Sequence, residues 1–209
     1  MDPINRLTEL FREFPGIGPR QAKRFVYFLL TRPTAYRGEL ASLVQELRNS
    51  TAVCGECFKF YIKRGGGSLC AICSNPDRNK SLLMIVGNDV DLENIEKSHS
   101  YDGLYFVLGG LVPVLESNPE KRVRERELIA LIEKKIATGS LKEIIIALSV
   151  NVEGDTTASY LKKILSPIAL PAGVTISVLG RGLSTGTELE YSDSDTIKNA
   201  LQNRTRGDA

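Results

Sequence analysis

The sequence predicts an α/β protein made of a small helical N-terminal part, a four-cysteine module and a larger domain with a mostly parallel β-sheet. Three observations support this fold class. Apolar residues recur at helical spacing before residue 50, the cysteines form two C-x₂-C pairs, and short apolar runs alternate with amphipathic segments after Asn79. Such alternation is typical of a sheet with helices on both faces. The length of 209 residues suffices for one large domain or two small ones.

Two helices separated by a tight turn are expected at the N-terminus. The first covers residues 3–14, where the apolar side chains lie three or four positions apart (Ile4, Leu7, Leu10, Phe11 and Phe14). Pro15 to Gly18 form a break, and Pro19 is a favourable first residue for the second helix. Thr31-Arg32-Pro33 ends that helix, and a third helix is expected at about residues 37–49.

The cysteines predict one structural zinc site. Their spacing is C-x₂-C-x₁₂-C-x₂-C, and they are Cys54, Cys57, Cys70 and Cys73. Four thiolates complete a tetrahedral Zn²⁺ site and leave no position for a reactive water. Metal binding would supply about 10 kcal/mol or more to a loop too small to fold alone. The alternative is a pair of disulfides, which needs an oxidising compartment. The start, MDPINRL, does not resemble a secretion signal, so we expect a cytoplasmic protein with free thiols.

The part of the chain after Asn79 predicts alternating strands and helices. Strands are expected at residues 82–86, 104–108, 143–148 and 174–179. Helices are expected near Leu92 and Ile95, over residues 123–137, over 156–165 and over 195–201. Residues 203–209 are expected to fray. The result is a sheet covered on both faces.

Composition indicates a globular protein with an uneven charge distribution. Hydrophobic residues make up 42% of the chain and charged residues 25%, which is ordinary for a folded domain. No apolar run approaches the roughly 20 residues needed to span a bilayer, so no membrane role is expected. Residues 1–80 carry 13 Lys and Arg against 7 Asp and Glu, whereas residues 81–209 carry 14 against 18. The basic front half favours a polyanionic partner there.

The turn between the first two helices has the residues of a phosphate-binding hairpin. Gly16 and Gly18 flank Ile17, and without a Cβ they let the backbone approach a ligand closely. The second helix points its free N–H groups and the positive end of its dipole at the same place. Cations follow in its first two turns: Arg20, Lys23 and Arg24. A plain glycine-rich connection would not explain these cations, so we predict sequence-independent contact with a nucleic-acid backbone.

The order of motifs resembles a known family. Residues 15–22, PGIGPRQA, are similar to the helix-hairpin-helix of non-specific DNA-binding proteins. The cysteine module and the α/β domain follow this motif, and the three parts in this order resemble the RecR family of recombination mediators. Further matching segments occur in the family's order: GLYFVLGG at 103–110, NVEGDTT at 151–157, RGL at 181–183 and LEY at 189–191.

The resemblance implies a non-catalytic DNA-repair and recombination protein. It implies a homotetrameric ring that acts as a clamp and, with RecO and where present RecF, helps RecA load onto single-stranded DNA. It divides the chain into a helix-hairpin-helix region at 1–52, the zinc module at 53–79, a Toprim-like domain at 80–180 and a C-terminal segment at 181–209. That last segment could be exchanged between subunits. A cytoplasmic, nucleoid-associated location follows.

The resemblance also identifies a departure from Toprim enzymes, which hold Mg²⁺ with a Glu after the first strand and a later Asp-x-Asp pair. Gly87 stands at the first position, and Ser149-Val150-Asn151 replaces the pair. A two-metal site therefore lacks ligands. The rival hypothesis is a Mg²⁺-dependent nuclease or phosphotransferase that uses other acids, namely Asp89, Asp91, Glu93 or Asp155. Acids in the first turn of a helix also simply offset its dipole.

An acidic stretch is the expected partner-binding site. Glu153-Gly154-Asp155 matches the segment that the family offers to RecO, so Glu153 and Asp155 are the candidate residues. The same residues would serve as ordinary N-terminal acids of a helix, and both roles are compatible. A third hypothesis is a zinc-stabilised protein-interaction module with no DNA role.

Overall fold

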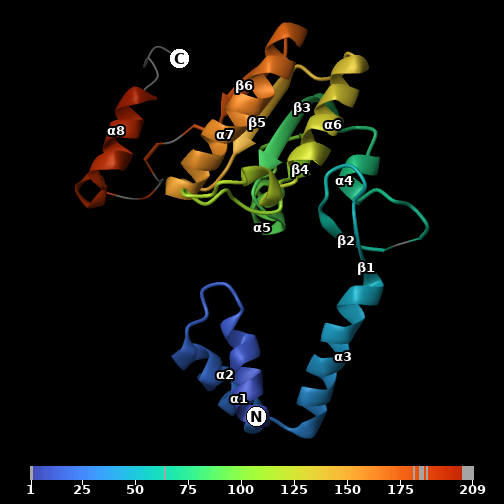
Figure 1. Cartoon of the computed structure of the whole chain (residues 1–209), viewed down its shortest axis with the longest axis vertical. Coiled ribbons are helices and arrows are strands. Elements are labelled where there is room, and N and C mark those ends of the chain that lie inside the picture. Colours follow the sequence, from blue (N-terminus) through green and yellow to red (C-terminus); the bar gives the residue numbers. More distant parts are fainter. Residues whose placement is uncertain (1, 64, 181, 184–185, 187, 204–209) are drawn as a thin grey trace. The chain divides into compact units, whose positions relative to one another are not determined.

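The computed structural model describes residues 2–63, 65–180, 182–183, 186 and 188–203 (Figure 1). The chain divides into two compact units, residues 1–52 and residues 53–209. The first unit is helical, and the second contains the cysteine module and a parallel sheet with helices. The predicted α/β fold class is confirmed.

The N-terminal unit contains three helices, α1 (Pro3–Arg12), α2 (Pro19–Leu30) and α3 (Thr34–Ser50). Asp2 caps α1 by accepting a hydrogen bond from the Asn5 backbone N–H at 3.0 Å. The Phe11 and Phe25 rings meet edge to face with their centroids 5.8 Å apart, which fixes α1 against α2. Helix α3 begins earlier than the predicted residue 37, at Thr34 directly after Pro33.

The cysteine module is folded around a short two-stranded sheet that the sequence did not predict. Its elements are β1 (Thr51–Val53), β2 (Phe60–Ile62) and α4 (Ala71–Ser74). Two backbone hydrogen bonds close the loops, from Cys54 N–H to the Lys59 carbonyl and from Gly55 N–H to the Ser68 carbonyl, each 2.9 Å long. These bonds place the two cysteine pairs opposite each other.

The larger unit is built around four parallel strands. These are β3 (Asn79–Val86), β4 (Gly103–Val107), β5 (Glu143–Ala147) and β6 (Thr175–Val178), in the order β4-β3-β5-β6. Strand β3 pairs on both sides, so Met84 lies opposite Tyr105 of β4 and Ile145 of β5. All four strands occur where apolar runs predicted them, although β3 begins at Asn79 rather than at residue 82.

Helices cover both faces of the sheet because alternate residues of each strand point to opposite sides. Ile85 of β3 packs in a core with residues of α6 (Glu125–Ala137) and α7 (Val152–Ala169), such as Ile132 and Leu161. Its neighbour Met84 packs on the other face with Leu92 of α5 (Asp89–Ser98). Ile85, Leu92, Ile132 and Leu161 are fully buried.

Helix α7 is longer at both ends than the predicted residues 156–165. It begins at Val152 because the Asn151 side chain accepts a hydrogen bond from the Gly154 N–H at 2.8 Å. It continues through Pro167 to Ala169, and the last turn is retained because Leu165 and Ala169 are fully buried.

The remaining elements are short. Three 3₁₀ turns occur at Pro119–Lys121, Leu170–Ala172 and Leu189–Tyr191, and α8 covers Ser194–Gln202. Asp193 caps α8 by accepting a hydrogen bond from the Thr196 N–H at 2.9 Å. Of the segment predicted to fray, only residue 203 belongs to the described residues. No helix in the described part of the chain is long and apolar enough to cross a membrane.

Candidate nucleic-acid interface and metal centre

The turn between α1 and α2 is a tight hairpin centred on two glycines. The Ile17 N–H donates to the Phe14 carbonyl at 3.1 Å, which closes the turn. Gly16 has φ of +73°, a conformation that costs a residue with a Cβ about 1–2 kcal/mol. The first glycine is therefore required by the backbone itself.

The second glycine has a different role. Gly18 is the N-cap of α2 with an ordinary φ of −80°. A Cβ built on it meets no protein atom within 4 Å, so the protein does not exclude a side chain there. Pro19 has no N–H, and the amides of Arg20 and Gln21 in the first turn have no acceptor within the helix. Since Gly18 provides no side-chain cap either, the end of α2 presents N–H groups and open space to an anion.

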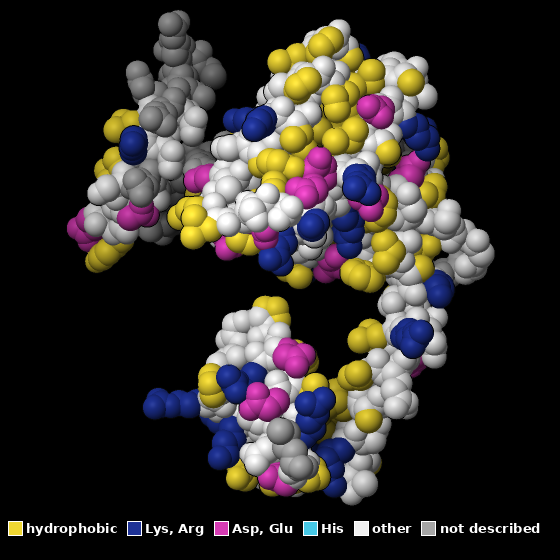
Figure 2. Space-filling model, viewed as in Figure 1, with side chains coloured by type: hydrophobic (Ala, Val, Ile, Leu, Met, Phe, Trp, Pro, Cys, Tyr) yellow, Lys and Arg dark blue, Asp and Glu magenta, His cyan; other side chains and the backbone are white. Residues whose placement is uncertain are grey.

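The three predicted cations lie beside this end of the helix. Arg20, Lys23 and Arg24 are all exposed, and their spacing places them on one face of α2. Arg24 has a side-chain hydrogen bond of 3.3 Å to Gln21, and within the described residues none of the three forms a salt bridge. Figure 2 shows several Lys and Arg side chains on the visible face of the N-terminal unit. The structure thus brings Gly16, Ile17, Gly18 and the cations together.

The predicted metal ligands also converge. The sulfur atoms of Cys54, Cys57, Cys70 and Cys73 all lie within 4.8 Å of one another. Cys54, Cys57 and Cys70 are buried, and Cys73 is partly exposed. Four thiolates around Zn²⁺, with Zn–S bonds of about 2.3 Å, would lie about 3.8 Å apart, so a small contraction of this cluster fits the ion.

The chemistry of the thiols favours a cation at their centre. Cys57 Sγ and Cys70 Sγ are 3.5 Å apart, and the Cys70 backbone N–H donates to Cys54 Sγ at 3.3 Å. The hydrogen bond to Cys70 raises the pKa of Cys57, whereas the same bond lowers the pKa of Cys70. Without a metal, neighbouring thiols therefore share protons instead of ionising together. A divalent ion would allow all four to be thiolates.

The module is fastened to one edge of the large sheet. The Val107 N–H at the end of β4 donates to the Cys57 carbonyl at 2.8 Å. The Phe58 ring, next in the chain, packs against Phe106 with centroids 5.4 Å apart and lies 5.5 Å from the Arg124 guanidinium. Arg124 in turn donates to the Val107 carbonyl at 2.8 Å. The order of the cysteine module is therefore coupled to packing in the main core.

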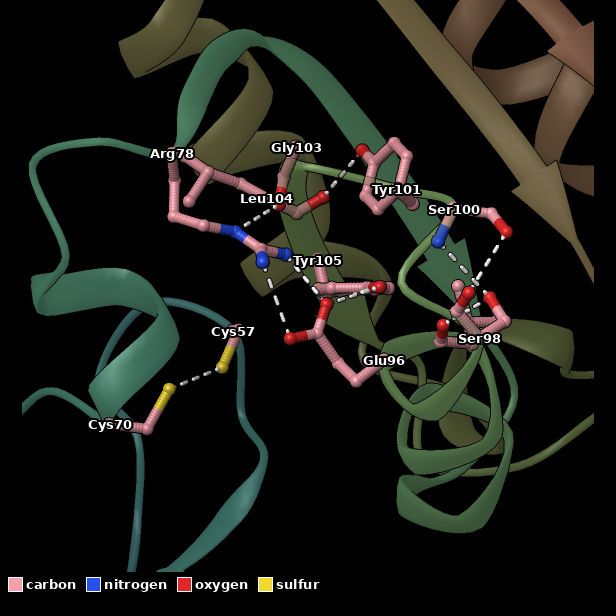
Figure 3. A network of polar contacts seen from close by, with 11 residues as sticks. Cys57, Cys70, Arg78, Glu96, Ser98, Ser100, Tyr101, Gly103, Leu104 and Tyr105 are labelled. Carbon is pink, nitrogen blue, oxygen red and sulfur yellow. Dashed lines mark hydrogen bonds and ion pairs between the residues drawn. The ribbon is translucent and has the colours of Figure 1, made fainter.

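A second connection begins at Arg78, at the end of the module (Figure 3). Its guanidinium donates to the Glu96 carboxylate at 2.7 and 3.3 Å and to the Gly103 carbonyl at 2.9 Å. The Tyr105 hydroxyl donates to the same carboxylate at 2.7 Å. Burial of the phenol, followed by this bond to Glu96, raises the pKa of Tyr105. Arg78 thus joins the end of the module to α5 and β4.

The corner where Toprim enzymes bind Mg²⁺ is occupied by structural contacts. A Cβ on Gly87 would lie 3.2 Å from Asp91 Oδ2, which accepts a hydrogen bond from the Asn88 N–H in a capping box. Asp89 accepts one from the Phe60 N–H at 2.8 Å, and the exposed Glu93 forms an ion pair with the partly buried Lys59. Among the described residues, the four cysteines are the only group of three or more His, Cys, Asp or Glu side chains that lie close enough together to hold a metal ion.

The predicted partner-binding acids lie in the first turn of α7. Glu153 and Asp155 are exposed, while Gly154 between them is buried. A Cβ at Gly154 would lie 1.9 Å from the Ser149 carbonyl oxygen, so only glycine fits there. Behind this turn the buried Thr157 hydroxyl donates to the Glu153 carbonyl at 2.7 Å and accepts from the Val112 N–H at 2.8 Å.

Sequence reasoning missed two groups of residues. The sequence presents Asp89 only as a possible metal ligand or an acid in the first turn of a helix, and nothing in it indicates the bond to Phe60. Tyr27 and Phe28 continue the face of α2 that carries the cations, and both are exposed. Their spacing of three and four residues from Arg24 is a signal that could have identified them.

Comparison with known proteins supports the resemblance over nearly the whole chain. Three family models match: "RecR, helix-hairpin-helix" at residues 4–48, "Toprim domain" at 81–180 and "RecR, C-terminal" at 182–205. The chain is 35% identical to the recombination protein RecR of Herpetosiphon aurantiacus, over 97% of this chain and 94% of that protein. It is 34% identical to the RecR of Prochlorococcus marinus strain AS9601, over 98% of this chain and 96% of that protein.

Proposed function

The chain belongs to the RecR family, and on that basis we propose that it is a non-catalytic, DNA-binding mediator of recombination and repair. The observation that carries the proposal is the end of α2. There an uncapped helix N-terminus, the open space at Gly18 and three exposed cations face one region. Phosphate oxygens suit such a site, and base identity plays no part in the contact.

In the proposed function, the protein works as a ring-shaped homotetrameric clamp. One hairpin offers only a few exposed phosphate contacts, whereas several hairpins around one strand raise the effective affinity by avidity. The N-terminal unit has apolar surface for self-association, because α1, α2 and α3 border a groove of about 790 Å³ lined by residues such as Leu10, Leu40 and Val44. Leu43 and Leu47 on α3 are also more than half exposed.

The second unit is proposed to bind proteins. In this role Glu153 and Asp155 contact RecO, and the assembly, with RecF where present, helps RecA load onto single-stranded DNA in the cytoplasm at the nucleoid. Exposure of both acids in the first turn of α7 supports the assignment. One structural Zn²⁺ per chain, held by the four cysteines, completes the module next to this domain.

The rival Mg²⁺-dependent nuclease or phosphotransferase is less well supported. Asp89 and Asp91 already accept backbone hydrogen bonds, and Glu93 pairs with Lys59. Use of Asp89 or Asp91 as a metal ligand would compete with those contacts. A cleavage assay separates the two functions, since Mg²⁺-dependent nicking that disappears in Asp91→Ala would establish the rival.

DNA binding over a range of salt concentrations tests the proposal. Each phosphate contact contributes about 0.7–0.9 to the slope of log affinity against log salt. The double variant Arg20→Ala/Arg24→Ala should therefore bind more weakly and with a shallower slope. The matched control is Arg6→Ala/Arg48→Ala, which removes two exposed arginines from α1 and α3 of the same unit. An unchanged slope in the α2 variant, or an equal loss in the control, would contradict the site.

A further inference from the structure

The cationic face of α2 continues into an aromatic surface. Tyr27 is 50% exposed and Phe28 is 42% exposed, although rings of this size normally bury most of their area. Both border a groove of about 800 Å³ along the helix, with Arg20, Lys23 and Arg24 at one end and Tyr27, Phe28 and Thr31 at the other. The residues from Arg20 to Thr31 span about 16 Å of helix.

One of the two rings is held in place by its neighbours. The Arg32 guanidinium lies over the Phe28 ring at 4.1 Å, and Tyr36 meets the same ring edge to face with centroids 6.3 Å apart. The Thr31 hydroxyl donates to the Phe28 carbonyl at 2.8 Å. Phe28 therefore has a fixed orientation, with one face already covered by a cation.

Tyr27 is the ring with room for a ligand. In the part of the chain that the structure describes, no aromatic ring or cation packs on Tyr27 and its hydroxyl has no hydrogen-bond partner. It lies one helical turn beyond Arg24 and Lys23, so a strand whose phosphates contact those cations would bring a base to its face. Aromatic rings beside a cationic groove are the usual platform for unpaired bases.

We propose that Tyr27, supported by Phe28 and Arg32, stacks on an unpaired base and makes the α2 face selective for single-stranded DNA. The inference rests on the proposed backbone contact and adds the class of nucleic acid to it. Bases of a duplex are stacked on each other and have no free face, whereas a single strand exposes them. The exposed cations favour a polyanion over a second copy of the chain as the occupant of this groove.

Three probes of equal length separate phosphate contact from base contact: an oligothymidine strand, a strand of abasic tetrahydrofuran units, and a duplex. The wild-type chain should bind oligothymidine about fivefold or more tighter than the abasic strand, since stacking on one aromatic ring is worth roughly that factor or more. Tyr27→Leu should lose this preference and keep its affinity for the abasic strand and the duplex. Tyr27→Phe should retain the preference, because the ring remains.

Tyr191→Leu is the matched control, since Tyr191 is an exposed tyrosine of the other unit. The chain has no Trp, so its intrinsic emission comes from tyrosine, and oligothymidine should quench it more in wild type than in Tyr27→Leu. A Tyr27→Leu variant that keeps the full preference for oligothymidine overturns the inference. The inference is also overturned if Tyr27→Leu loses affinity equally for all three probes and its mass in light scattering changes. This face would then be a contact between subunits.

The result that would contradict the proposed function differs from the result that would contradict stacking on Tyr27. If Arg20→Ala/Arg24→Ala binds all three probes as wild type does, the hairpin site is wrong whatever Tyr27 does. If that variant loses affinity for all three probes and Tyr27→Leu matches wild type, only the stacking inference is wrong.

Discussion

The Asp89 carboxylate accepts a hydrogen bond of 2.8 Å from the backbone N–H of Phe60. The bond joins the first turn of α5 to β2 of the cysteine module, residues 29 positions apart in the chain. An acid that the rival hypothesis would use as a metal ligand thus fastens the cysteine module to the domain.

Replacement of Asp89 tests this structural role. Asp89→Ala leaves the Phe60 N–H without its charged acceptor and removes an acid from the first turn of α5, so unfolding free energy should fall by about 1–2 kcal/mol. Urea denaturation of the zinc-loaded chain measures this change in the free energy of unfolding. Glu93→Ala is the control: the Glu93 carboxylate is exposed and its contact with Lys59 is long, at 3.4 Å, so the cost should stay below about 1 kcal/mol. Equal costs in the two variants, or stabilisation of wild type alone by Mg²⁺, would contradict the role.

The two hairpin glycines should respond differently to alanine. Gly18→Ala introduces a Cβ into open space at an ordinary φ, so it should cost less than about 1 kcal/mol of stability and still weaken DNA binding several-fold. Gly16→Ala must adopt φ of +73°, so it should be destabilising by about 1–2 kcal/mol. Thermal melts and binding titrations on both variants check this. Loss of stability without loss of binding in Gly18→Ala would exclude close approach of a ligand at that residue.

Removal of the metal should loosen the second unit before it affects the hairpin. Chelation leaves buried thiols without their cation, and the Phe58 ring and the Val107–Cys57 hydrogen bond then lose their anchor. Hydrogen exchange should show faster exchange of the Val107 amide, while amides of α1 and α2 keep their protection. DNA binding should decline only as the oligomer dissociates. Loss of binding with an intact fold and oligomer would show that the module itself contacts DNA.

The features predicted from sequence are those that depend on local pattern. The cysteine spacing predicted that the four thiols converge, the Gly-Ile-Gly turn predicted the hairpin, and apolar runs predicted all four strands. What failed depends on distant contacts. Pro167 suggests a helix end, but burial of Ala169 outweighs it. The strands β1 and β2 have three residues each, which is too short for a recognisable alternation of apolar and polar residues. The bond from Asp89 to Phe60 joins segments that no spacing relates.

Tyr105 of the Arg78 network, and Tyr101, whose ring packs against it with centroids 5.0 Å apart, should make the fold sensitive to alkaline pH. Burial raises the pKa of Tyr105 and of Tyr101 above the value of about 10 for a free phenol. A raised folded-state pKa means that the folded chain holds its protons longer than the unfolded chain. Their contribution is therefore complete below about pH 10 and is lost as pH rises through the folded-state pKa. Denaturation at a series of alkaline pH values should show a shallower decline in Tyr105→Phe, and an unchanged slope would contradict the assignment.

The hydroxyl of Thr157 should decide how the loop after β4 is held beside Glu153. Thr157 is fully buried, and its Oγ1 accepts the Val112 N–H at 2.8 Å. Thr157→Val preserves shape but leaves that buried N–H without an acceptor, at a cost of about 1–3 kcal/mol. Thr157→Ser keeps the acceptor and loses only a methyl group, at about 1 kcal/mol. Hydrogen exchange should show the Val112 amide exposed in the valine variant and protected in the serine variant. If both variants expose it equally, packing of the methyl group rather than the hydrogen bond positions the loop.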